Sequence, residues 1–219
     1  MGQKYITQKD YIRAGEKFEP YIRETNRLLR NDEYIVMHLD GVKFTSKYLK
    51  SYDSNVKKQF FDCLVSSAIE LCDYFQGSRI AYVYGDEVSI ILAGDAIKNN
   101  YNNRIQKLCS ISSGFLSLKL AEKLSGTNNP VFNKLLGNCF FSSKVYNIPF
   151  EFVDDYMHWR LMGCKKLIFD KRQNFENCAE WERFGALILN ENNQWVTQNI
   201  DFAQSHFKRS PQSEYFTLK

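Results

Sequence analysis

The run RIAYVYGDEVSIILAG, residues 79–94, constrains the fold of this chain more than any other segment. Residues 79–84 and 88–94 are rich in the β-branched, aromatic and aliphatic residues that favour strands, and only GDE lies between them. Two strands joined by so short a turn pair in the antiparallel sense, because a parallel pair needs a crossover of a dozen or more residues. The segment therefore predicts a β-hairpin with acidic residues at its tip.

The segments that flank this hairpin predict two further strands and three helices. A strand-like apolar run occupies residues 33–41, and another occupies residues 137–149. Apolar residues recur at three- and four-residue steps from Val56 to Phe75 and again from Ile105 to Ala121, which predicts two amphipathic helices. Residues 150–173 predict a third helix with a basic end.

The order of these elements, βαββαβ, predicts the fold class. It is the order of an α+β, polymerase-palm-like (ferredoxin-like) domain, an antiparallel sheet with helices on one face. The sequence predicts four strands in this sheet. We expect a helical lead-in at residues 1–32, the palm-like core at 33–175 and a C-terminal extension at 176–219.

Three acids stand where the predicted strands end. Asp86 and Glu87 lie in the hairpin turn, and Asp40 ends the first strand beside Gly41. In a βαββαβ sheet the first strand lies next to the hairpin, so the carboxylates can meet at one edge of the sheet. GDE is also a common exposed turn in which the acids are simply solvated. The second strand-end acid favours a divalent-cation site instead, and hard oxygen ligands suit magnesium.

Composition limits the cellular location and the kinds of site expected of this chain. The net charge of +4 permits a polyanionic partner without requiring one. No apolar run is long enough to cross a bilayer, and the six cysteines include no C-x-x-C pair. We therefore expect a cytoplasmic protein with no membrane partner, no zinc ribbon and no disulfide framework. Only three histidines are present, which leaves little material for histidine-based catalysis.

Five segments of the chain carry a family resemblance. HLDGVKF (38–44) matches a strand that ends in L-D-G-x-x-F, and YGDEVS (84–89) matches a hairpin with D-E-x-S. Further along, RIQKLCSISSGF (104–115) approximates an R-x-x-K helix, and FFSSKVYNIP (140–149) approximates an F-D-x-R-V-x-x-x-P strand. DDYMHWRLMGC (154–164) approximates a D-Y-x-x-W-R-x-x-D-C helix. In this order and spacing, the chain resembles the tRNA-His guanylyltransferase family, including its tRNA-repair branch, over about residues 33–174.

The resemblance implies an activity and a set of partners. It implies a magnesium-dependent nucleotidyltransferase that adds a nucleotide in the 3′→5′ direction to the 5′ end of tRNA or another RNA. Two Mg²⁺ ions, GTP and ATP would take part, and the protein would assemble as a homo-tetramer or dimer. Asp40, Asp86 and the carbonyl oxygen of Gly41 would hold the two ions, and Glu87 would support them or ligate transiently.

The resemblance also assigns residues to nucleotide binding. Backbone amides around Lys43, Phe44 and Thr45 would hold a triphosphate. The basic side chains of Arg104 and Lys107, on one helix, would also contact it. Lys47 or Lys50 would contact a second, activating nucleotide. From the residues alone, Arg104 and Lys107 are equally typical of an ordinary solvated helix face.

Five positions depart from the family pattern. Each replaces a residue that the motifs would lead one to expect, and they are Tyr84, Ser142, Lys144, Gly163 and Lys165. The predicted metal centre is left intact while the substrate-reading parts change, so strict tRNA-His specificity is not expected. Four basic residues in and just after the altered segment 163–171 would bind RNA phosphates or form an ordinary basic helix end: Lys165, Lys166, Lys171 and Arg172.

Two other functions stay open. YGDEVS also resembles the G-G-D-E-F turn of cyclic-dinucleotide synthases, although only Gly85 precedes the acid. Such an enzyme would make a small cyclic or linear nucleotide without RNA. Alternatively, the chain is a palm-derived RNA-binding scaffold that has lost catalysis, which the altered segment 163–171 favours and the intact acids disfavour.

Overall fold

The computed structural model describes residues 16, 20, 27–93, 101–170 and 177–198, apart from the side chains of residues 165–170. Most of the predicted helical lead-in at 1–32 lies outside these residues. The strands are β1 (Tyr34–Gly41), β2 (Ser78–Tyr84), β3 (Glu87–Leu92), β4 (Phe141–Ile148), β5 (Ala186–Glu191) and β6 (Gln194–Gln198). The α-helices are α3 (Phe44–Lys47), α4 (Ser54–Tyr74), α5 (Ile105–Gly126), α6 (Asn133–Leu136), α7 (Val153–Asp170) and α8 (Glu180–Phe184). Short 3₁₀ turns are η1 (Leu49–Ser51), η3 (Tyr101–Asn103), η4 (Pro130–Phe132) and η5 (Phe150–Phe152).

The strands form one antiparallel sheet in the order β4-β1-β3-β2-β5-β6. The first four of these strands, with α4 and α5, follow the predicted βαββαβ order, so the α+β palm-like fold class is confirmed. The hairpin is confirmed as well: Tyr84 pairs with Glu87 across a two-residue turn. Gly85 has a φ of 58° at the first turn position, which glycine adopts without strain.

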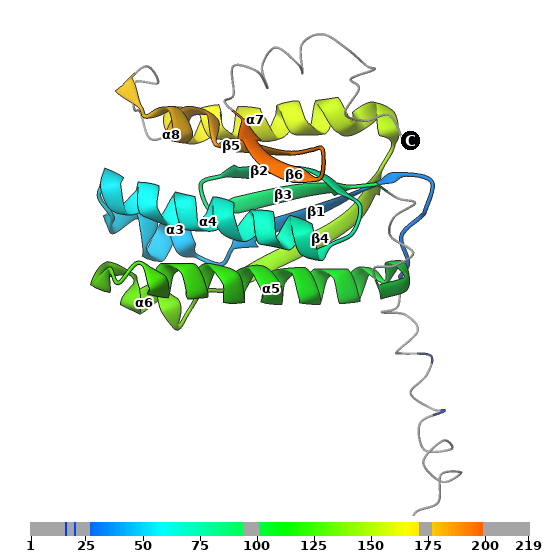
Figure 1. The fold of residues 1–219 in the computed structure, drawn as a ribbon, viewed down its shortest axis with the longest axis horizontal. Coiled ribbons are helices and arrows are strands. Elements are labelled where there is room, and N and C mark those ends of the chain that lie inside the picture. The colour runs from blue at the N-terminus through cyan, green and yellow to red at the C-terminus, as the bar shows by residue number, and fades with distance from the viewer. Residues whose placement is uncertain (1–15, 17–19, 21–26, 94–100, 171–176, 199–219) are drawn as a thin grey trace, which may run out of the picture.

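Helices α4 and α5 cover one face of the sheet (Figure 1). Helix α4 begins at Asp53, whose side chain accepts a hydrogen bond from the amide of Val56 at 2.9 Å and so caps the first turn. Its predicted apolar stripe is buried against the sheet, with Phe60, Leu64 and Leu71 at most 1% exposed. Each such side chain contributes on the order of 1.5–3 kcal/mol by leaving water.

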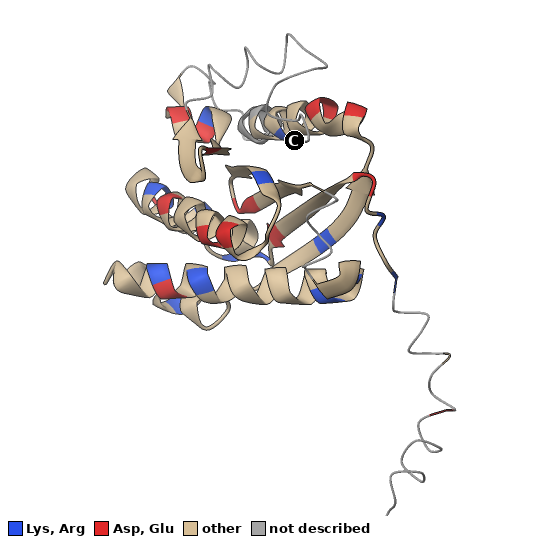
Figure 2. Ribbon diagram, turned by 45° about the vertical axis from the view of Figure 1, so that its right-hand side comes forward, with Lys and Arg blue, Asp and Glu red and all other residues tan. Residues whose placement is uncertain are grey.

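Helix α7 lies across the opposite face of the sheet, together with α8 (Figure 1), so the prediction of helices on one face only was wrong. The strands are therefore buried on both sides, and Figure 2 shows most of the charged residues on the helices and near strand ends. Along β1, side chains alternate between the two faces. Met37 and Leu39 face α4 and α5, whereas Tyr34 and Val36 pack against α7. By the same alternation, His38 and Asp40 belong to the α7 face.

Two strands extend the sheet beyond the four that the sequence predicted. β5 pairs with β2, and β6 pairs with β5 through a tight turn at Asn192 and Asn193, which have φ values of 52° and 62°. Residues 186–198 thus join the core sheet, although the prediction assigned them to a C-terminal extension. Among the described residues, no helix combines the length and the hydropathy that crossing a membrane requires.

Candidate active site

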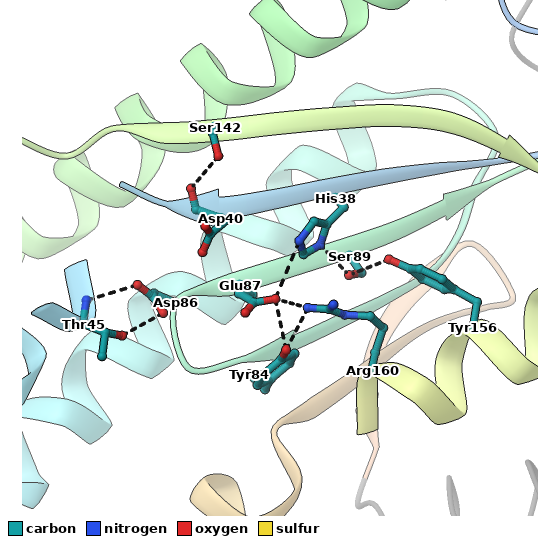
Figure 3. Close-up of polar contacts among 10 residues, drawn as sticks. All are labelled: His38, Asp40, Thr45, Tyr84, Asp86, Glu87, Ser89, Ser142, Tyr156 and Arg160. Carbon is teal, nitrogen blue, oxygen red and sulfur yellow. Dashed lines mark hydrogen bonds and ion pairs between the residues drawn. The ribbon is translucent and has the colours of Figure 1, made fainter. Parts of the chain in front are cut away.

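Asp40 and Asp86 meet at one end of the sheet (Figure 3). Asp40 is the penultimate residue of β1, where it pairs with Glu87 on β3 and with Ser142 on β4. Asp86 lies in the β2–β3 turn, and its carbonyl oxygen accepts a hydrogen bond from the amide of Gly41 at 3.1 Å. This bond ties the end of β1 to the turn, so the two acids are neighbours as the sequence predicted.

The segment after β1 holds the Asp86 carboxylate. Lys43 has a φ of 62° and turns the chain into α3. Thr45 then donates from its amide to Asp86 Oδ2 at 3.2 Å and from its hydroxyl to Oδ1 at 3.0 Å. Gly41 permits the tight turn, because a Cβ there would lie 2.4 Å from the buried Phe44 ring. The motif HLDGVKFT therefore supplies both an acid and the donors that fix its partner.

The two carboxylates are electrostatically unbalanced. Burial raises the pKa of Asp86 above its ordinary value, the charge of Asp40 raises it further, and the hydrogen bonds from Thr45 oppose this. Burial also raises the pKa of Asp40, although nearby Lys144 and Arg160 lower it. Within the described part of the chain, neither carboxylate is in ion-pair contact with a cation. Two close carboxylates that lack a paired cation match the donor set of a divalent metal ion.

The protein side chains alone do not enclose a metal ion. The described residues contain no group of three or more His, Cys, Asp or Glu side chains placed to hold one. Magnesium is commonly bound by one or two carboxylates while it keeps several waters and substrate phosphates. Asp40, Asp86 and the carbonyl oxygen of Gly41 therefore fit magnesium better than a metal that needs a complete protein cage.

Glu87 is turned away from this pair and is held by α7. Its Oε2 atom accepts from the hydroxyl of Tyr84 at 3.0 Å and forms an ion pair with Arg160. Arg160 also donates to the Tyr84 hydroxyl at 2.8 Å, and its guanidinium carbon lies 5.1 Å from the centre of the Tyr84 ring. We call Tyr84, Glu87 and Arg160 the Glu87 clamp. It joins β2, β3 and α7 directly beside Asp86 (Figure 3).

A second chain of polar contacts leads into the Glu87 clamp. The Tyr156 hydroxyl donates to Ser89 Oγ at 3.0 Å, and Ser89 Oγ lies 3.1 Å from His38 Nδ1. His38 Nε2 lies 3.6 Å from Glu87 Oε2. Burial lowers the pKa of His38 to about 4, helped by the charges of Arg160 and Lys144, so His38 is neutral at neutral pH. Arg160 is therefore the cation that balances Glu87.

The residues predicted to bind nucleotide between positions 43 and 50 follow Asp40 closely in the sequence. The amide of Thr45 is occupied by Asp86, whereas within the described residues the amides of Lys43 and Phe44 have no acceptor. Lys47 and Lys50 are exposed, on α3 and η1. Of the three amides predicted to hold a triphosphate, that of Thr45 is therefore already hydrogen-bonded within the protein.

Arg104 and Lys107 lie elsewhere. Arg104 precedes α5 and pairs with Leu28, just before β1 begins. From Tyr34 to Asp40 the strand advances by about 20 Å at 3.3 Å per residue. The start of α5 is therefore at the opposite end of the sheet from the acid pair, and the structure does not bring these two basic residues to it.

Four of the five departures from the family pattern surround the acids. Ser142 Oγ donates to the carbonyl oxygen of Asp40 at 3.4 Å, and Lys144 pairs with His38 across β4 and β1. Tyr84 belongs to the Glu87 clamp. Gly163 faces it, since a Cβ on Gly163 would lie 2.7 Å from the Tyr84 hydroxyl. The side chains of Lys165 and Lys166, and all of Lys171 and Arg172, lie outside the described residues.

The sequence prediction missed Arg160, His38 and Tyr156. Arg160 was visible as the arginine of the D-Y-x-x-W-R segment, and it is only 6% exposed. Arg160 follows Tyr156 and Met157 at four- and three-residue steps, so it lies on the apolar stripe of the predicted helix, where an arginine needs an acidic partner; this was a usable signal. His38 stands two positions before Asp40 and therefore on the same strand face, which was a second signal.

Comparisons with known proteins relate this chain to a family and to solved structures of the same fold. A family model described as tRNAHis guanylyltransferase (Thg1) matches residues 13–149, which include the acid-bearing strands and end before α7. No curated protein matches the sequence significantly.

Three solved structures share the fold. A bacterial tRNA(His) guanylyltransferase (Thg1)-like protein in complex with GTP has a TM-score of 0.69 at 18% identity, over 94% of this chain and 100% of that one. A bacterial protein of the same description in complex with ATP has a TM-score of 0.65 at 17% identity, over 88% and 96%. The tRNA(His) guanylyltransferase from Saccharomyces cerevisiae has a TM-score of 0.57 at 19% identity, over 84% and 97%.

Proposed function

This chain belongs to the tRNAHis guanylyltransferase family, and on that premise we propose that it adds a nucleotide in the 3′→5′ direction to the 5′ end of tRNA or a tRNA-like RNA. We propose that the reaction depends on magnesium and that GTP supplies the nucleotide, with ATP able to activate a monophosphate end. The GTP and ATP complexes of structurally similar bacterial proteins support this choice of nucleotides.

The observation that carries the proposal is the pairing of Asp40 with Asp86. An exposed turn with solvated acids would need neither the two hydrogen bonds from Thr45 nor the bond from Gly41 that brings the strands together. At this end of the sheet the protein instead holds two carboxylates at raised pKa values, and neither has a paired cation among the residues that the structure describes. Such unfavourable charge is typical of a site that binds a charged ligand.

Asp40, Asp86 and the carbonyl oxygen of Gly41 would hold the magnesium ions. When bound, the ions would neutralise the phosphate oxygens and orient the attacking and leaving oxygens of the transfer. The part played by the chain itself is to fix the two carboxylates: Thr45 holds Asp86, and the β1–β3 pairing places Asp40 beside it.

The proposed transfer forms one bond and breaks another. The 3′-hydroxyl oxygen of the incoming nucleotide bonds to the 5′ α-phosphorus of the RNA, and the bond from that phosphorus to pyrophosphate or AMP breaks. Catalysis of this kind is mostly positioning and charge neutralisation, so a histidine base is not needed. This agrees with His38, the histidine nearest the acids, being neutral and engaged with Ser89.

Nucleotide contacts form a further part of the proposal. We propose that the amides of Lys43 and Phe44 meet a triphosphate and that Lys47 or Lys50 meets an activating nucleotide. We also propose that Arg104 and Lys107 contact phosphate. Because these two residues lie at the other end of the sheet, that phosphate would be distant from the acid pair.

The test is label transfer with purified protein, magnesium and each α-labelled nucleoside triphosphate in turn. Truncated tRNA with a 5′ mono- or triphosphate is present in one arm and absent in the other. Label joined to RNA, and lost with Asp86→Ala, supports the proposal. A small phosphatase-resistant product formed without RNA would indicate a cyclic-nucleotide synthase, and RNA binding without any transfer would indicate a scaffold.

A further inference from the structure

Glu87 follows Asp86 in the chain, where a third metal ligand could lie, but its side chain contacts Tyr84 and Arg160. Asp86 and Glu87 are consecutive, and their side chains point in different directions: Asp86 toward Thr45 and Glu87 toward Arg160 (Figure 3). Within the described residues, the polar contacts of the Glu87 carboxylate, with Tyr84, Arg160 and His38, all involve the single oxygen Oε2. The Arg160 side chain is only 7% exposed, so water screens this ion pair weakly.

We propose that the Glu87 clamp is a positioning device: Glu87 does not bind metal, and the clamp fixes the β2–β3 turn to α7 so that Asp86 faces Asp40. Arg160 supplies the balancing charge, and Tyr84 bridges it to Glu87 through a hydroxyl that both accepts and donates. This inference rests on the proposed function for its activity readout, but its metal-binding readout stands without it.

Gly163 packs so closely against Tyr84 that a single substitution there should disturb the Glu87 clamp. Glycine inside a helix is unfavourable compared with alanine, and Gly163 has an ordinary negative φ within α7. A reason for glycine is the room that the Tyr84 hydroxyl occupies, since a Cβ would lie 2.7 Å from that oxygen and 3.0 Å from Cζ. Tyr84 and Gly163 are therefore complementary in size, and a methyl group at 163 must displace the hydroxyl that completes the clamp.

The test compares four variants with a matched control and with Asp86→Asn, which removes a proposed metal ligand. Glu87→Gln, Tyr84→Phe, Gly163→Ala and the double variant Tyr84→Phe/Gly163→Ala are examined for Mn²⁺ affinity by electron paramagnetic resonance, for kcat and for thermal unfolding. Gly114→Ala is the control, because Gly114 lies within α5 with no atom within 4 Å of its would-be Cβ. We expect the control to bind Mn²⁺ and to turn over like the native protein.

The clamp predicts similar and moderate losses among the single variants. Each is expected to weaken Mn²⁺ binding and lower kcat by about tenfold, at the lower end of what changes behind the metal ligands cause. The double variant should lose less than the product of the two single losses, because removal of the hydroxyl relieves the closest contact at position 163 although Cζ remains 3.0 Å away. A purely structural role would instead lower the unfolding temperature and leave both readouts of the folded protein unchanged.

Three results would overturn the proposal. One is a loss of Mn²⁺ binding in Glu87→Gln as complete as in Asp86→Asn, with Gly163→Ala unaffected, which would make Glu87 a ligand. Another is a Gly163→Ala variant with native Mn²⁺ affinity and kcat. The third is a double variant whose losses in Mn²⁺ affinity and kcat equal the product of the losses in the two single variants. If Gly163→Ala does not fold, Tyr84→Phe and the double variant carry the comparison. A native protein that binds Mn²⁺ but transfers nothing refutes the proposed function and leaves the clamp testable by metal affinity.

Discussion

Thr45 holds both oxygens of the Asp86 carboxylate, with its amide 3.2 Å from Oδ2 and its hydroxyl 3.0 Å from Oδ1. The two donors come from the start of α3, so a helix that directly follows β1 sets the orientation of an acid in the β2–β3 turn. The loop after the first strand and the hairpin tip therefore act as one unit.

Replacement of Thr45 by valine keeps the shape of the side chain and removes the hydroxyl donor. A hydrogen bond to a charged group contributes roughly 1.5–3 kcal/mol, so we expect Mn²⁺ affinity to fall about tenfold or more. The pKa of Asp86 should also rise, because the Thr45 hydrogen bond lowers it. Thr45→Ser retains the hydroxyl and is the control. Equal Mn²⁺ affinities for the serine and valine variants would show that the hydroxyl is not needed.

Asp40→Asn removes one of two close negative charges. Both carboxylates have a raised pKa in the folded protein, so their ionised forms oppose folding at neutral pH, and this effect fades as pH falls through the folded pKa. In EDTA we expect the variant to unfold about 1–2 °C higher than the native protein, a small shift because Asp40 is partly solvated. Magnesium should raise the unfolding temperature of the native protein and not that of the variant. A variant that magnesium still stabilises would place the ion elsewhere.

His38 makes the metal-free protein sensitive to acid. Its folded pKa of about 4 lies below its ordinary value of 6.5, so the unfolded chain takes up the proton first as pH falls. Stability from this group is complete above the ordinary pKa and declines until the folded pKa is reached, by about 3 kcal/mol in total. Urea unfolding in EDTA at pH 7 and pH 4.5 should show a smaller decline for His38→Asn than for the native protein. Parallel declines would show that His38 is not the group responsible.

Lys144 is expected to act on metal and nucleotide in opposite directions. Its positive charge lowers the pKa of Asp40, so it opposes a cation at the acid pair and favours an anionic triphosphate near it. Lys144→Ala should raise Mn²⁺ affinity two- to threefold, roughly the effect of an exposed charge, and should weaken metal-free GTP binding. Lys107→Ala is the matched control at the far end of the sheet and should leave Mn²⁺ affinity unchanged. Equal effects of the two changes on Mn²⁺ would contradict this arrangement.

Local sequence pattern predicted those features that depend on a single segment. The GDE hairpin and the buried stripe of α4 are local in this sense, and the strand-end acids came together because the βαββαβ order is itself a strong constraint. For α5, the helix was predicted and Leu108 of the predicted stripe is buried, but the fully buried face also includes Leu116, Leu120 and Leu124. Leu118 lies within the predicted stripe from Ile105 to Ala121 but is 67% exposed, while Ser112 is buried and its hydroxyl oxygen lies 2.9 Å from that of Ser143 on β4.

Other features depended on tertiary partners or on a signal that was overlooked. The Glu87 clamp requires α7 to cross the hairpin, and nothing local to Tyr84 or Arg160 specifies that crossing. By contrast, β5 and β6 had a visible signal: the run ALIL is followed by Asn192 and Asn193 and then by QWVTQ, a hairpin pattern.

The most direct measurement of the central claim is transfer from α-labelled GTP to a truncated tRNA that has a 5′ triphosphate and a periodate-oxidised 3′ end. Only addition at the 5′ end can label this RNA. The account predicts that label joins it in the presence of magnesium and the native protein, and that Asp86→Ala abolishes the transfer. Label that joins only RNA with an intact 3′ end, or transfer that survives Asp86→Ala, would contradict it.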